Sequence, residues 1–363
     1  MNPDNADIPG FLPSGAFASP ASSHIARCAQ LAMLLEVSAS PKPGNVDREH
    51  DYPDTCFEHF VASSVGVYPA LEFAARSREG VGALIKAAVS ESSAWQRGGN
   101  THFGAFLLLV PLAMAAGEFF GIKASGNGSF GQESFSQERF GYESFILKAS
   151  DFEVLASRAH AFVRATDSED AVEFYRAFGA AGVRVNSVEE FDLEDPEATA
   201  ELREQNITLY DLMEISKGYD LIANEWTSGF GRCLEGARCI LDFMQARNGG
   251  AESSVRGSSP DCSGTGINEA VVYAFIKLLS RHRDTFIQTK FDSETADYVS
   301  SRAREILLAR EDGSGPASRA FSSLIPAIRE FDSELLEKRI NPGSTADIII
   351  AGLFIALLGG LRF

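Results

Sequence analysis

Apolar residues recur at the three-to-four-residue spacing of amphipathic helices over most of the chain. No sustained run alternates apolar and polar positions, as a half-buried strand would. The pattern therefore predicts an all-α fold, a compact bundle of about a dozen helices. The predicted helices cover residues 24–38, 56–77, 82–95, 101–120, 152–164, 167–178, 208–226, 229–244, 267–281, 293–308, 318–338 and a closing segment that starts at 344.

Two of these helices are apolar on almost every face. Residues 101–120 carry few polar side chains, which indicates a helix enclosed by others. Pro111 lies inside this segment and cannot donate a backbone hydrogen bond, so we expect a kink or a neighbouring group that replaces the lost bond. Residues 348–361 are too short to cross a bilayer comfortably, and they predict a buried final helix.

Three segments fall outside the helical pattern. Residues 1–22 lack the basic start and apolar run of a signal peptide, so they predict a flexible tail. Residues 124–146 repeat Phe every five positions amid Ser, Gly, Gln and Glu, which indicates an inserted loop or, alternatively, an aromatic strip for a partner. Residues 248–266 are rich in Gly and Ser and predict a flexible loop. The apolar helices otherwise continue without a long linker, so residues 23–363 are expected to form a single domain.

The charge of the chain narrows the classes of function. The 363 residues carry a formal net charge of −18, which argues against a nucleic-acid binder because such proteins need a basic surface. Arginine outnumbers lysine 24 to 8, and this acidic, lysine-poor composition fits either a protein of a halophilic host or an ordinary acidic protein. The five cysteines form no CxxC pair. We therefore expect reduced thiols in a cytoplasm, without a zinc site or a disulfide framework.

The loop after the first predicted helix combines groups that bind phosphate and metal. Lys42 and Arg48 can contact phosphate, and Gly44 lets backbone amides approach an anion. Asp47 and Asp51 offer the hard oxygens that Mg²⁺ prefers. The alternative is a charged loop that meets only solvent.

Two further motifs lie at helix starts. Asn100 and Thr101 precede the first apolar helix and can cap its first turn, where free amides favour an anion. His102 can contact phosphate or move a proton, unless it is a hydrogen-bonded core histidine. Gly343 and Ser344 form a similar turn before the closing helix.

Acidic residues near helix ends complete the candidate set. Asp347 on the first turn of the closing helix either stabilises the helix dipole or holds a metal. Asp284 and Lys290 follow a predicted helix end and offer an acid and a base. The alternative is that this helix end is simply exposed to solvent. Asp220 and Glu225 lie in an apolar pattern, where they either make satisfied core contacts or line a site. Because several helix ends carry the same groups, the sequence predicts an active site where helix N-termini converge.

These motifs resemble those of the triphosphoribosyl-dephospho-CoA synthase family, in its archaeal-looking branch. The likeness depends on Ser-Pro-Lys-Pro-Gly-Asn-Val-Asp-Arg at residues 40–48, Asn-Thr-His-Phe-Gly-Ala at 100–105 and Asn-Pro-Gly-Ser-Thr-Ala-Asp at 341–347. Residues 170–176 and 220–225 also look like that branch. The motifs follow one another in order over nearly the whole chain.

The resemblance implies an all-helical transferase with ATP as a substrate. Members of the family move the triphosphoribosyl group of ATP to the 2′-hydroxyl of 3′-dephospho-CoA and release adenine. Such a reaction needs Mg²⁺ and basic groups at the triphosphate, and carboxylates near a ribose carbon that gains cationic character. The expected partners are ATP and a dephospho-CoA-like acceptor, with no nucleic acid and no membrane, and the chain could form a homodimer.

The resemblance also assigns roles to the candidate residues. The catalytic group, as general base, cation stabiliser or proton carrier, comprises Asp284, Glu225 and His102. The magnesium ligands are Asp47, Asp347 and Asp51. The residues expected to bind ATP and its phosphates are Lys42, Gly44, Arg48, Asn100, Thr101, His102, Gly104, Lys290, Gly343 and Ser344.

One departure from the family pattern leaves the acceptor open. After Arg48 the chain continues Glu-His-Asp-Tyr-Pro-Asp, where the bacterial pattern has Gly and His before an Asp-Met pair. A related cofactor precursor is therefore an alternative acceptor. Two other functions are compatible with the same motifs: a nucleosidase or hydrolase that uses water as acceptor, and a non-catalytic nucleotide sensor.

Overall fold

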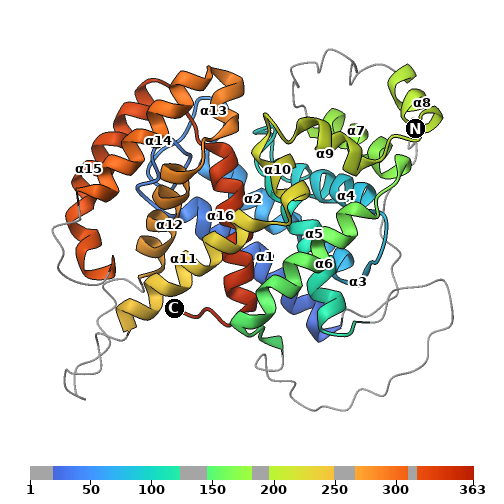
Figure 1. Ribbon diagram of the computed structural model, residues 1–363, viewed down its shortest axis with the longest axis horizontal. Helices are drawn as coiled ribbons and strands as arrows, with labels where there is room; N and C mark the ends of the chain where they lie inside the picture. Colours follow the sequence, from blue (N-terminus) through green and yellow to red (C-terminus); the bar gives the residue numbers. More distant parts are fainter. Residues whose placement is uncertain (1–18, 123–144, 182–195, 249–265, 310–316) are drawn as a thin grey trace, which may run out of the picture.

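The computed structural model describes residues 19–122, 145–181, 196–248, 266–309 and 317–363. Every regular element within these residues is a helix (Figure 1), so the prediction of an all-α fold is confirmed. The α-helices, in chain order, are α1 (Pro20–Ser38), α2 (Phe57–Gly66), α3 (Tyr68–Arg76), α4 (Val81–Ser93), α5 (Phe103–Phe119), α6 (Phe152–Arg164), α7 (Ser168–Ala181), α8 (Pro196–Glu204), α9 (Leu209–Ser216), α10 (Leu221–Ser228), α11 (Gly231–Asn248), α12 (Ile267–Arg281), α13 (Thr285–Lys290), α14 (Ser293–Leu308), α15 (Ala317–Glu337) and α16 (Gly343–Leu358).

Helix α16 forms the centre of the bundle. It contacts α1, α5, α11 and α12, and residues 348–358 are all buried. In Figure 1 it runs through the middle of the molecule, with α12, α14 and α15 on one side and α5, α6 and α10 on the other. Among the described residues, no helix is both long enough and apolar enough to span a bilayer. The final apolar run is therefore a core helix, as its length predicts.

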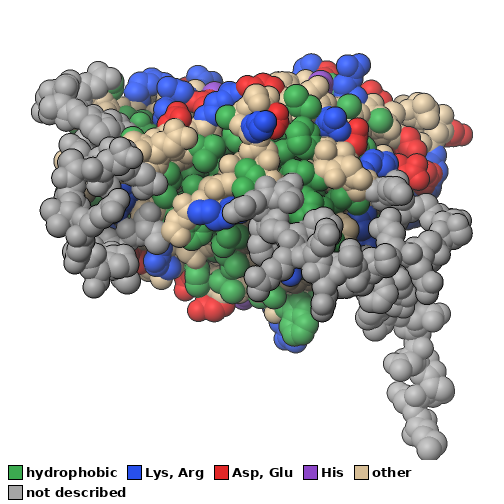
Figure 2. Space-filling view, turned by 90° about the horizontal axis from the view of Figure 1, so that it is seen from below, with side chains coloured by type: hydrophobic (Ala, Val, Ile, Leu, Met, Phe, Trp, Pro, Cys, Tyr) green, Lys and Arg blue, Asp and Glu red, His purple; other side chains and the backbone are tan. Residues whose placement is uncertain are grey.

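The surface carries charges of both signs. On the face shown in Figure 2, acidic and basic side chains are interspersed along the upper rim, and apolar side chains lie below them. The described residues on this face form no continuous basic area of the kind that a nucleic-acid backbone requires.

Helix α5 contains Pro111, and a tryptophan replaces the hydrogen bond that this proline cannot make. Pro111 has no N–H to donate to the carbonyl of Leu107, one helical turn earlier. The indole nitrogen of Trp226 donates to that same carbonyl at 2.9 Å, and Trp226 is fully buried. This contact, one of the two outcomes predicted from the sequence, fastens α10 to the buried helix α5.

Replacing Trp226 with phenylalanine is expected to lower the free energy of unfolding by about 2 kcal/mol, because the Leu107 carbonyl would remain buried without a donor. Urea unfolding followed by circular dichroism measures the change. The matched control is Trp95→Phe, since Trp95 is 77% exposed. Equal effects of the two substitutions would contradict this assignment.

Several predicted helices have different boundaries in the structure. The predicted helix 56–77 is divided into α2 and α3. The predicted helix 208–226 is divided into α9 and α10, because the Asp220 carboxylate accepts hydrogen bonds from Ile222 N at 2.7 Å and Ala223 N at 3.1 Å and so starts a new helix. The bundle therefore has more helices than the predicted dozen.

The ends of the predicted domain also change. Helix α1 begins at Pro20, capped by the Ser19 hydroxyl, which accepts from Ser22 N at 3.0 Å. The predicted tail 1–22 is thus too long at its C-terminal end, and its first eighteen residues lie outside the described part. The predicted insert 124–146 and the loop 248–266 also lie almost wholly outside the described residues.

Candidate active site

The N-termini of α10, α13 and α16 meet through direct hydrogen bonds. The backbone N–H of Leu221 at the start of α10 donates to the Thr285 hydroxyl at 2.8 Å. The same hydroxyl lies 3.3 Å from the hydroxyl of Ser344, at the start of α16. The carboxylate of Asp284, which precedes α13, accepts from the backbone N–H and the hydroxyl of Thr345 at 2.7 and 2.8 Å. Three helix starts that are distant in the sequence therefore share one hydrogen-bonded junction.

The start of α5 joins this junction through Asp347 and Gly104. Asp347 lies on the first turn of α16, and its carboxylate interacts with the backbone N–H of Ala105. A Cβ atom at Gly104 would lie 2.2 Å from Oδ2 of Asp347, so only glycine leaves room for that carboxylate. Gly104 and Asp347 are both partly exposed. The predicted convergence of helix N-termini is therefore present.

Four carboxyl groups lie within electrostatic range of one another here. Burial, followed by the charges of Glu36, Asp284 and Asp220, raises the pKa of Asp347 well above its usual range. Burial raises the pKa of Asp284 to about 6, against the opposing effect of the Thr345 donors. Burial also raises the pKa values of Glu36 and Asp220. At each of these carboxyl groups the protein surroundings therefore favour the neutral form over the charged one.

Lys42 is the basic group inside the cluster, and it is fully buried. Its ammonium lies 2.5 Å from Glu36 Oε1 and 3.4 Å from Asn45 Oδ1. Lys42 is predicted to contact a triphosphate, and its partners within the protein are Glu36 and Asn45. Removing either member would leave a buried charge without its partner, which is costly.

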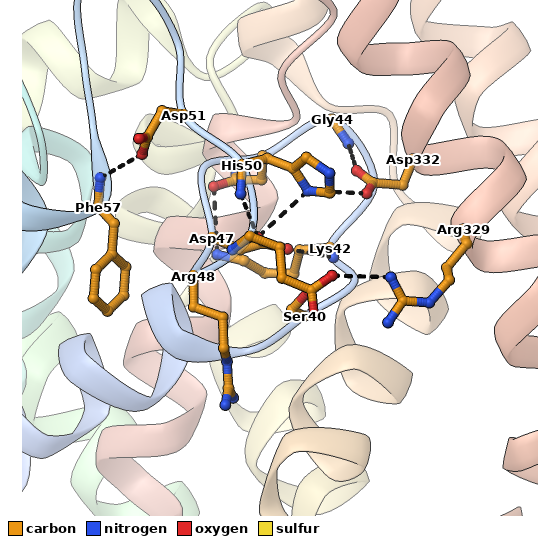
Figure 3. A network of polar contacts seen from close by, with 12 residues as sticks. Ser40, Lys42, Gly44, Asp47, Arg48, His50, Asp51, Phe57, Arg329 and Asp332 are labelled. Atoms are coloured by element: carbon orange, nitrogen blue, oxygen red, sulfur yellow. Dashed lines mark hydrogen bonds and ion pairs between the residues drawn. The ribbon is translucent and has the colours of Figure 1, made fainter.

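Asp47, which the sequence predicts to bind metal, holds the loop that carries Lys42 (Figure 3). Oδ1 of Asp47 accepts from the backbone N–H of Glu49 at 2.7 Å and of His50 at 3.1 Å. Oδ2 of Asp47 accepts from the backbone N–H of Lys42 at 3.2 Å. Asp47 is also fully buried. Because both oxygens are occupied by backbone donors, the geometry gives Asp47 a role in shaping the loop.

Helix α15 fixes the same loop from the other side. Oδ1 of Asp332 accepts from the backbone N–H of Gly44 at 2.9 Å, and its Oδ2 lies 3.4 Å from His50 Nδ1. Gly44 has a φ of +70°, and a Cβ there would lie 2.1 Å from the carbonyl oxygen of Ile340. The amide of Gly44, a residue predicted to contact phosphate, is therefore bonded to Asp332 within the protein.

Two further predicted residues also have partners or positions away from the junction. Arg48 is exposed and bonds to the carbonyl of Ser38 and, at 2.9 Å, to Asn268 Oδ1. Asp51 is exposed and caps α2 through Phe57 N at 2.8 Å, as Figure 3 shows.

Glu225 and Lys290 do not present free groups to the junction either. The fully buried Glu225 carboxylate accepts from the backbone N–H groups of Arg232 and Cys233 at 3.0 and 3.1 Å, and it pairs with the Arg232 guanidinium at 2.8 Å. It therefore caps α11, and a role as general base is not favoured. Lys290 is exposed on the last turn of α13, at the opposite end of that helix from Asp284.

The motif at the start of α5 presents polar atoms that have no protein partner. Asn100 Oδ1 caps the helix by accepting from Phe103 N at 2.9 Å, as predicted. The hydroxyl of Thr101 and Nε2 of His102 are both buried without a hydrogen-bond partner. Asn100, Thr101 and His102 line a small pocket together with Ser92 and Ser93 of α4. Buried polar atoms are rarely left without a partner, so a water molecule or a ligand atom in this pocket would supply the missing one.

His102 is held as a neutral imidazole. It is 1% exposed, and burial followed by the charge of Lys42 lowers its pKa to about 3. The ring packs against Phe60 with a centroid distance of 5.0 Å. His102 can therefore act at neutral pH through hydrogen bonds, and electrostatic attraction to an anion must come from other groups.

Sequence reasoning missed several residues of the site. Glu36 is an acid on the apolar face of α1, and a single acid in an apolar helical pattern was a signal that could have identified it. Thr345 lies beside the predicted Ser344, and it is the closer partner of Asp284. Gly343 packs against the Phe286 ring, 3.3 Å from where its Cβ would be, so it brings α13 and α16 together.

The described residues contain no group of three or more His, Cys, Asp and Glu side chains arranged to hold a metal ion by themselves. Mg²⁺ commonly uses only one or two carboxylates and completes its coordination with water and substrate phosphates. Asp347 fits such a site, because the residue is less buried than Asp47 and its carboxyl group lies near those of Glu36, Asp284 and Asp220. Asp47 and Asp51 fit less well, since their oxygens already accept backbone hydrogen bonds.

Comparison with known proteins agrees with the family resemblance of the sequence motifs. The family model CitG, described as ATP:dephospho-CoA triphosphoribosyl transferase, matches residues 22–362. The crystal structure of a candidate triphosphoribosyl-dephospho-CoA synthase from Archaeoglobus fulgidus is similar to this chain, with 27% sequence identity and a TM-score of 0.55 over 84% of this chain and 100% of the other. No curated protein gives a significant match. Because the family model spans the chain from α1 to its last residues, the resemblance seen in the motifs is confirmed, and the chain belongs to the ATP:dephospho-CoA triphosphoribosyl transferase family.

Proposed function

We propose that this chain transfers the triphosphoribosyl group of ATP to a hydroxyl of 3′-dephospho-CoA, with release of adenine. In this reaction the bond between C1′ and N9 of ATP breaks and a bond forms between C1′ and the acceptor oxygen. The hydroxyl proton leaves the acceptor, and adenine departs with a proton. The observation that carries the proposal is the junction of four helix N-termini around the carboxyl group of Asp347, within the family-matched region.

The helix starts supply a site for the triphosphate. Free N–H groups and the helix dipole make a helix N-terminus favourable for anions. At the start of α5, the unpartnered Thr101 hydroxyl and His102 Nε2 offer further polar contacts. We assign these two residues, with Asn100 as the cap that shapes the turn, to the binding of ATP.

A cation is needed between these carboxylates and the triphosphate. We propose that this cation is Mg²⁺, with Asp347 as its protein ligand. When bound, Mg²⁺ neutralises phosphate charge and holds the triphosphate in a fixed orientation. The electrostatic cluster of Glu36, Asp220, Asp284 and Asp347 supports the assignment, because like charges at this density favour a cation nearby. Burial, and after it the charges of Glu36, Asp284 and Asp220, raises the pKa of Asp347.

Asp284 is better suited to hold the site together than to remove a proton. Its two oxygens accept four hydrogen bonds, from Phe286 N, Ile287 N, Thr345 N and the Thr345 hydroxyl. It is fully buried. We therefore propose Asp284 as a positioning residue for the first turn of α16, where it keeps Asp347 in place. The cationic character of the ribose carbon would be stabilised by the partly exposed acids, Asp220 and Asp347.

Adenine release tests the proposal. The protein is incubated with ATP and Mg²⁺, with and without 3′-dephospho-CoA, and the products are identified by mass spectrometry. We expect adenine and a product heavier than the acceptor by one triphosphoribosyl group, both dependent on the acceptor. Release of adenine with water alone would support the hydrolase, and binding of ATP without release would support the sensor.

If 3′-dephospho-CoA is inert, a panel of related cofactor precursors carrying a free ribose hydroxyl identifies the acceptor. The departure from the bacterial pattern after Arg48 is the reason for this second step. We also propose that the protein works in the cytoplasm, where ATP and the acceptor are made. In agreement with this, Cys28, Cys56, Cys233 and Cys239 are all free thiols.

A further inference from the structure

Two buried serines connect helices α2 and α4 to the imidazole of His102. The hydroxyl of Ser92 lies 2.6 Å from the hydroxyl of Ser63, and the hydroxyl of Ser63 lies 2.7 Å from His102 Nδ1. The three residues are 3%, 0% and 1% exposed. They form a linear chain of hydrogen bonds that ends at one ring nitrogen and leaves the other, Nε2, without a protein partner.

The chain of hydrogen bonds can run in two directions. In one direction Ser92 donates to Ser63, Ser63 donates to Nδ1, and the imidazole carries its hydrogen on Nε2, where no protein atom accepts it. In the other direction Nδ1 donates to Ser63, Ser63 donates to Ser92, and the hydroxyl hydrogen of Ser92 has no acceptor. Each direction leaves one buried donor unpaired, but a phosphate oxygen at Nε2 would accept the free hydrogen of the first and would meet a lone pair in the second, so phosphate binding at Nε2 favours the first direction.

The neighbouring serines form different hydrogen bonds from Ser63 and Ser92. The hydroxyl of Ser64 donates to the Phe60 carbonyl at 2.7 Å, and that of Ser93 donates to the Val89 carbonyl at 2.8 Å. Neither Ser63 nor Ser92 makes such a bond to its own helix within the described chain. Their hydroxyl groups are therefore committed to each other and to His102.

We infer that Ser63 and Ser92 are positioning residues that hold His102 as the Nε2–H tautomer, so that this buried imidazole presents a hydrogen-bond donor to bound ATP. The inference rests on the proposed function for the identity of the ligand, since phosphate oxygens accept hydrogen bonds and do not donate them at neutral pH. The opposite tautomer would present the Nε2 lone pair to phosphate and repel it. Ser63 and Ser92 lie outside the three sequence motifs.

The neutral state of His102 makes the tautomer decisive. A charged imidazole donates from both nitrogens, and its serine partners would not affect what Nε2 offers. Burial and the positive charge of Lys42 hold the pKa of His102 at about 3. The ring also lies against Phe60 and Phe106, with centroid distances of 5.0 and 6.0 Å. With the ring enclosed and uncharged, the hydrogen-bond direction at Nδ1 alone sets the character of Nε2.

The tautomer is measured directly on the full chain with ATP bound and without acceptor. Histidine is labelled with ¹⁵N, and long-range proton–nitrogen correlation spectra distinguish a protonated from an unprotonated ring nitrogen. The chain has six histidines, and the signals missing from His102→Gln identify the residue. We expect His102 to carry its hydrogen on Nε2 and to show no titration at neutral pH. A hydrogen on Nδ1, or a charged ring at neutral pH, would overturn the inference.

Ser63→Ala then removes the donor to Nδ1. We expect the tautomer to become mixed and the affinity for ATP to fall about tenfold, the effect of one hydrogen bond to a charged ligand. The matched control is Ser64→Ala, because Ser64 lies next to Ser63 and bonds only to the carbonyl of its own helix. Its tautomer and affinity should be unchanged.

Ser92→Ala provides a second variant in case Ser63→Ala does not fold. Ser63 can still donate to Nδ1 after this change, so the tautomer should persist while the Nδ1 signal shifts. An unchanged tautomer in folded Ser63→Ala, or an unchanged Nδ1 signal in Ser92→Ala, would contradict the role of that serine. The spectra decide this question even if the protein shows no transferase activity, so failure of the inference and failure of the proposed function remain distinguishable.

Discussion

Replacing Asp347 with asparagine is expected to reduce turnover by at least about a hundredfold while leaving the protein as stable as before, or more stable. The carboxylate that we assign to Mg²⁺ would become a neutral amide, which is a poor ligand for this ion. Stability should not suffer, since burial and then the charges of Glu36, Asp284 and Asp220 disfavour a charge on Asp347 in the folded protein. The amide oxygen can still accept the hydrogen bond from Ala105 N.

Two measurements on the same preparation separate the effects of this change. Adenine release gives the turnover, and urea unfolding gives the stability. Asp242→Asn is the control, because Asp242 is an exposed acid on α11. Turnover of Asp347→Asn close to that of the unchanged protein would remove Asp347 from the site. A clear loss of stability would show that the carboxylate is paired in a way the structure does not contain.

Replacing Gly104 with alanine is expected to cause a loss of turnover of the same order, although alanine is chemically inert. The new methyl group would need the space of Asp347 Oδ2, which lies 2.2 Å from its position. Gly104 has no left-handed backbone conformation that would itself exclude alanine, so the effect comes from displacement of the carboxylate. A misplaced catalytic group can cost about two orders of magnitude in rate.

The combination of the two substitutions tests whether they act on one group. If Gly104→Ala acts by moving Asp347, adding it to Asp347→Asn should reduce turnover little further. Gly179→Ala on α7 is the matched control, since a Cβ at Gly179 would meet no atom within 4 Å. That change should stabilise the helix slightly and leave turnover unaltered. Additive losses in the double variant would contradict the proposed displacement.

The helical fold could be predicted from the sequence because apolar periodicity records which faces are buried. The errors came where a side chain ended or began a helix. Asp220 and Thr208 cap two short helices, α10 and α9, inside a segment whose periodicity continues without interruption. Periodicity alone cannot distinguish one helix from two that share an apolar face. The replacement of the Pro111 hydrogen bond was foreseen as one of two outcomes, but its donor, Trp226, required the tertiary structure.

Only part of the site could be predicted from the sequence, and the reason differs from that for the fold. A carboxylate beside glycine at a helix start is suited both to bind Mg²⁺ and to cap the helix, and the sequence contains no information on which of these it does. Asp347 is partly exposed and faces other acids, whereas Asp47 and Glu225 accept backbone hydrogen bonds with both oxygens. Glu36, Ser63 and Ser92 contact the site from other helices, so no local motif includes them.

The account depends on ATP binding at the junction of the α5, α10, α13 and α16 N-termini. A crystal structure of the protein with ATP and Mg²⁺, without acceptor, is the most direct measurement. We predict triphosphate density at this junction, with a phosphate oxygen at hydrogen-bond distance from His102 Nε2 and Mg²⁺ bound to Asp347. Triphosphate bound at another surface, with the Asp347 and His102 side chains free of ligand, would contradict the account.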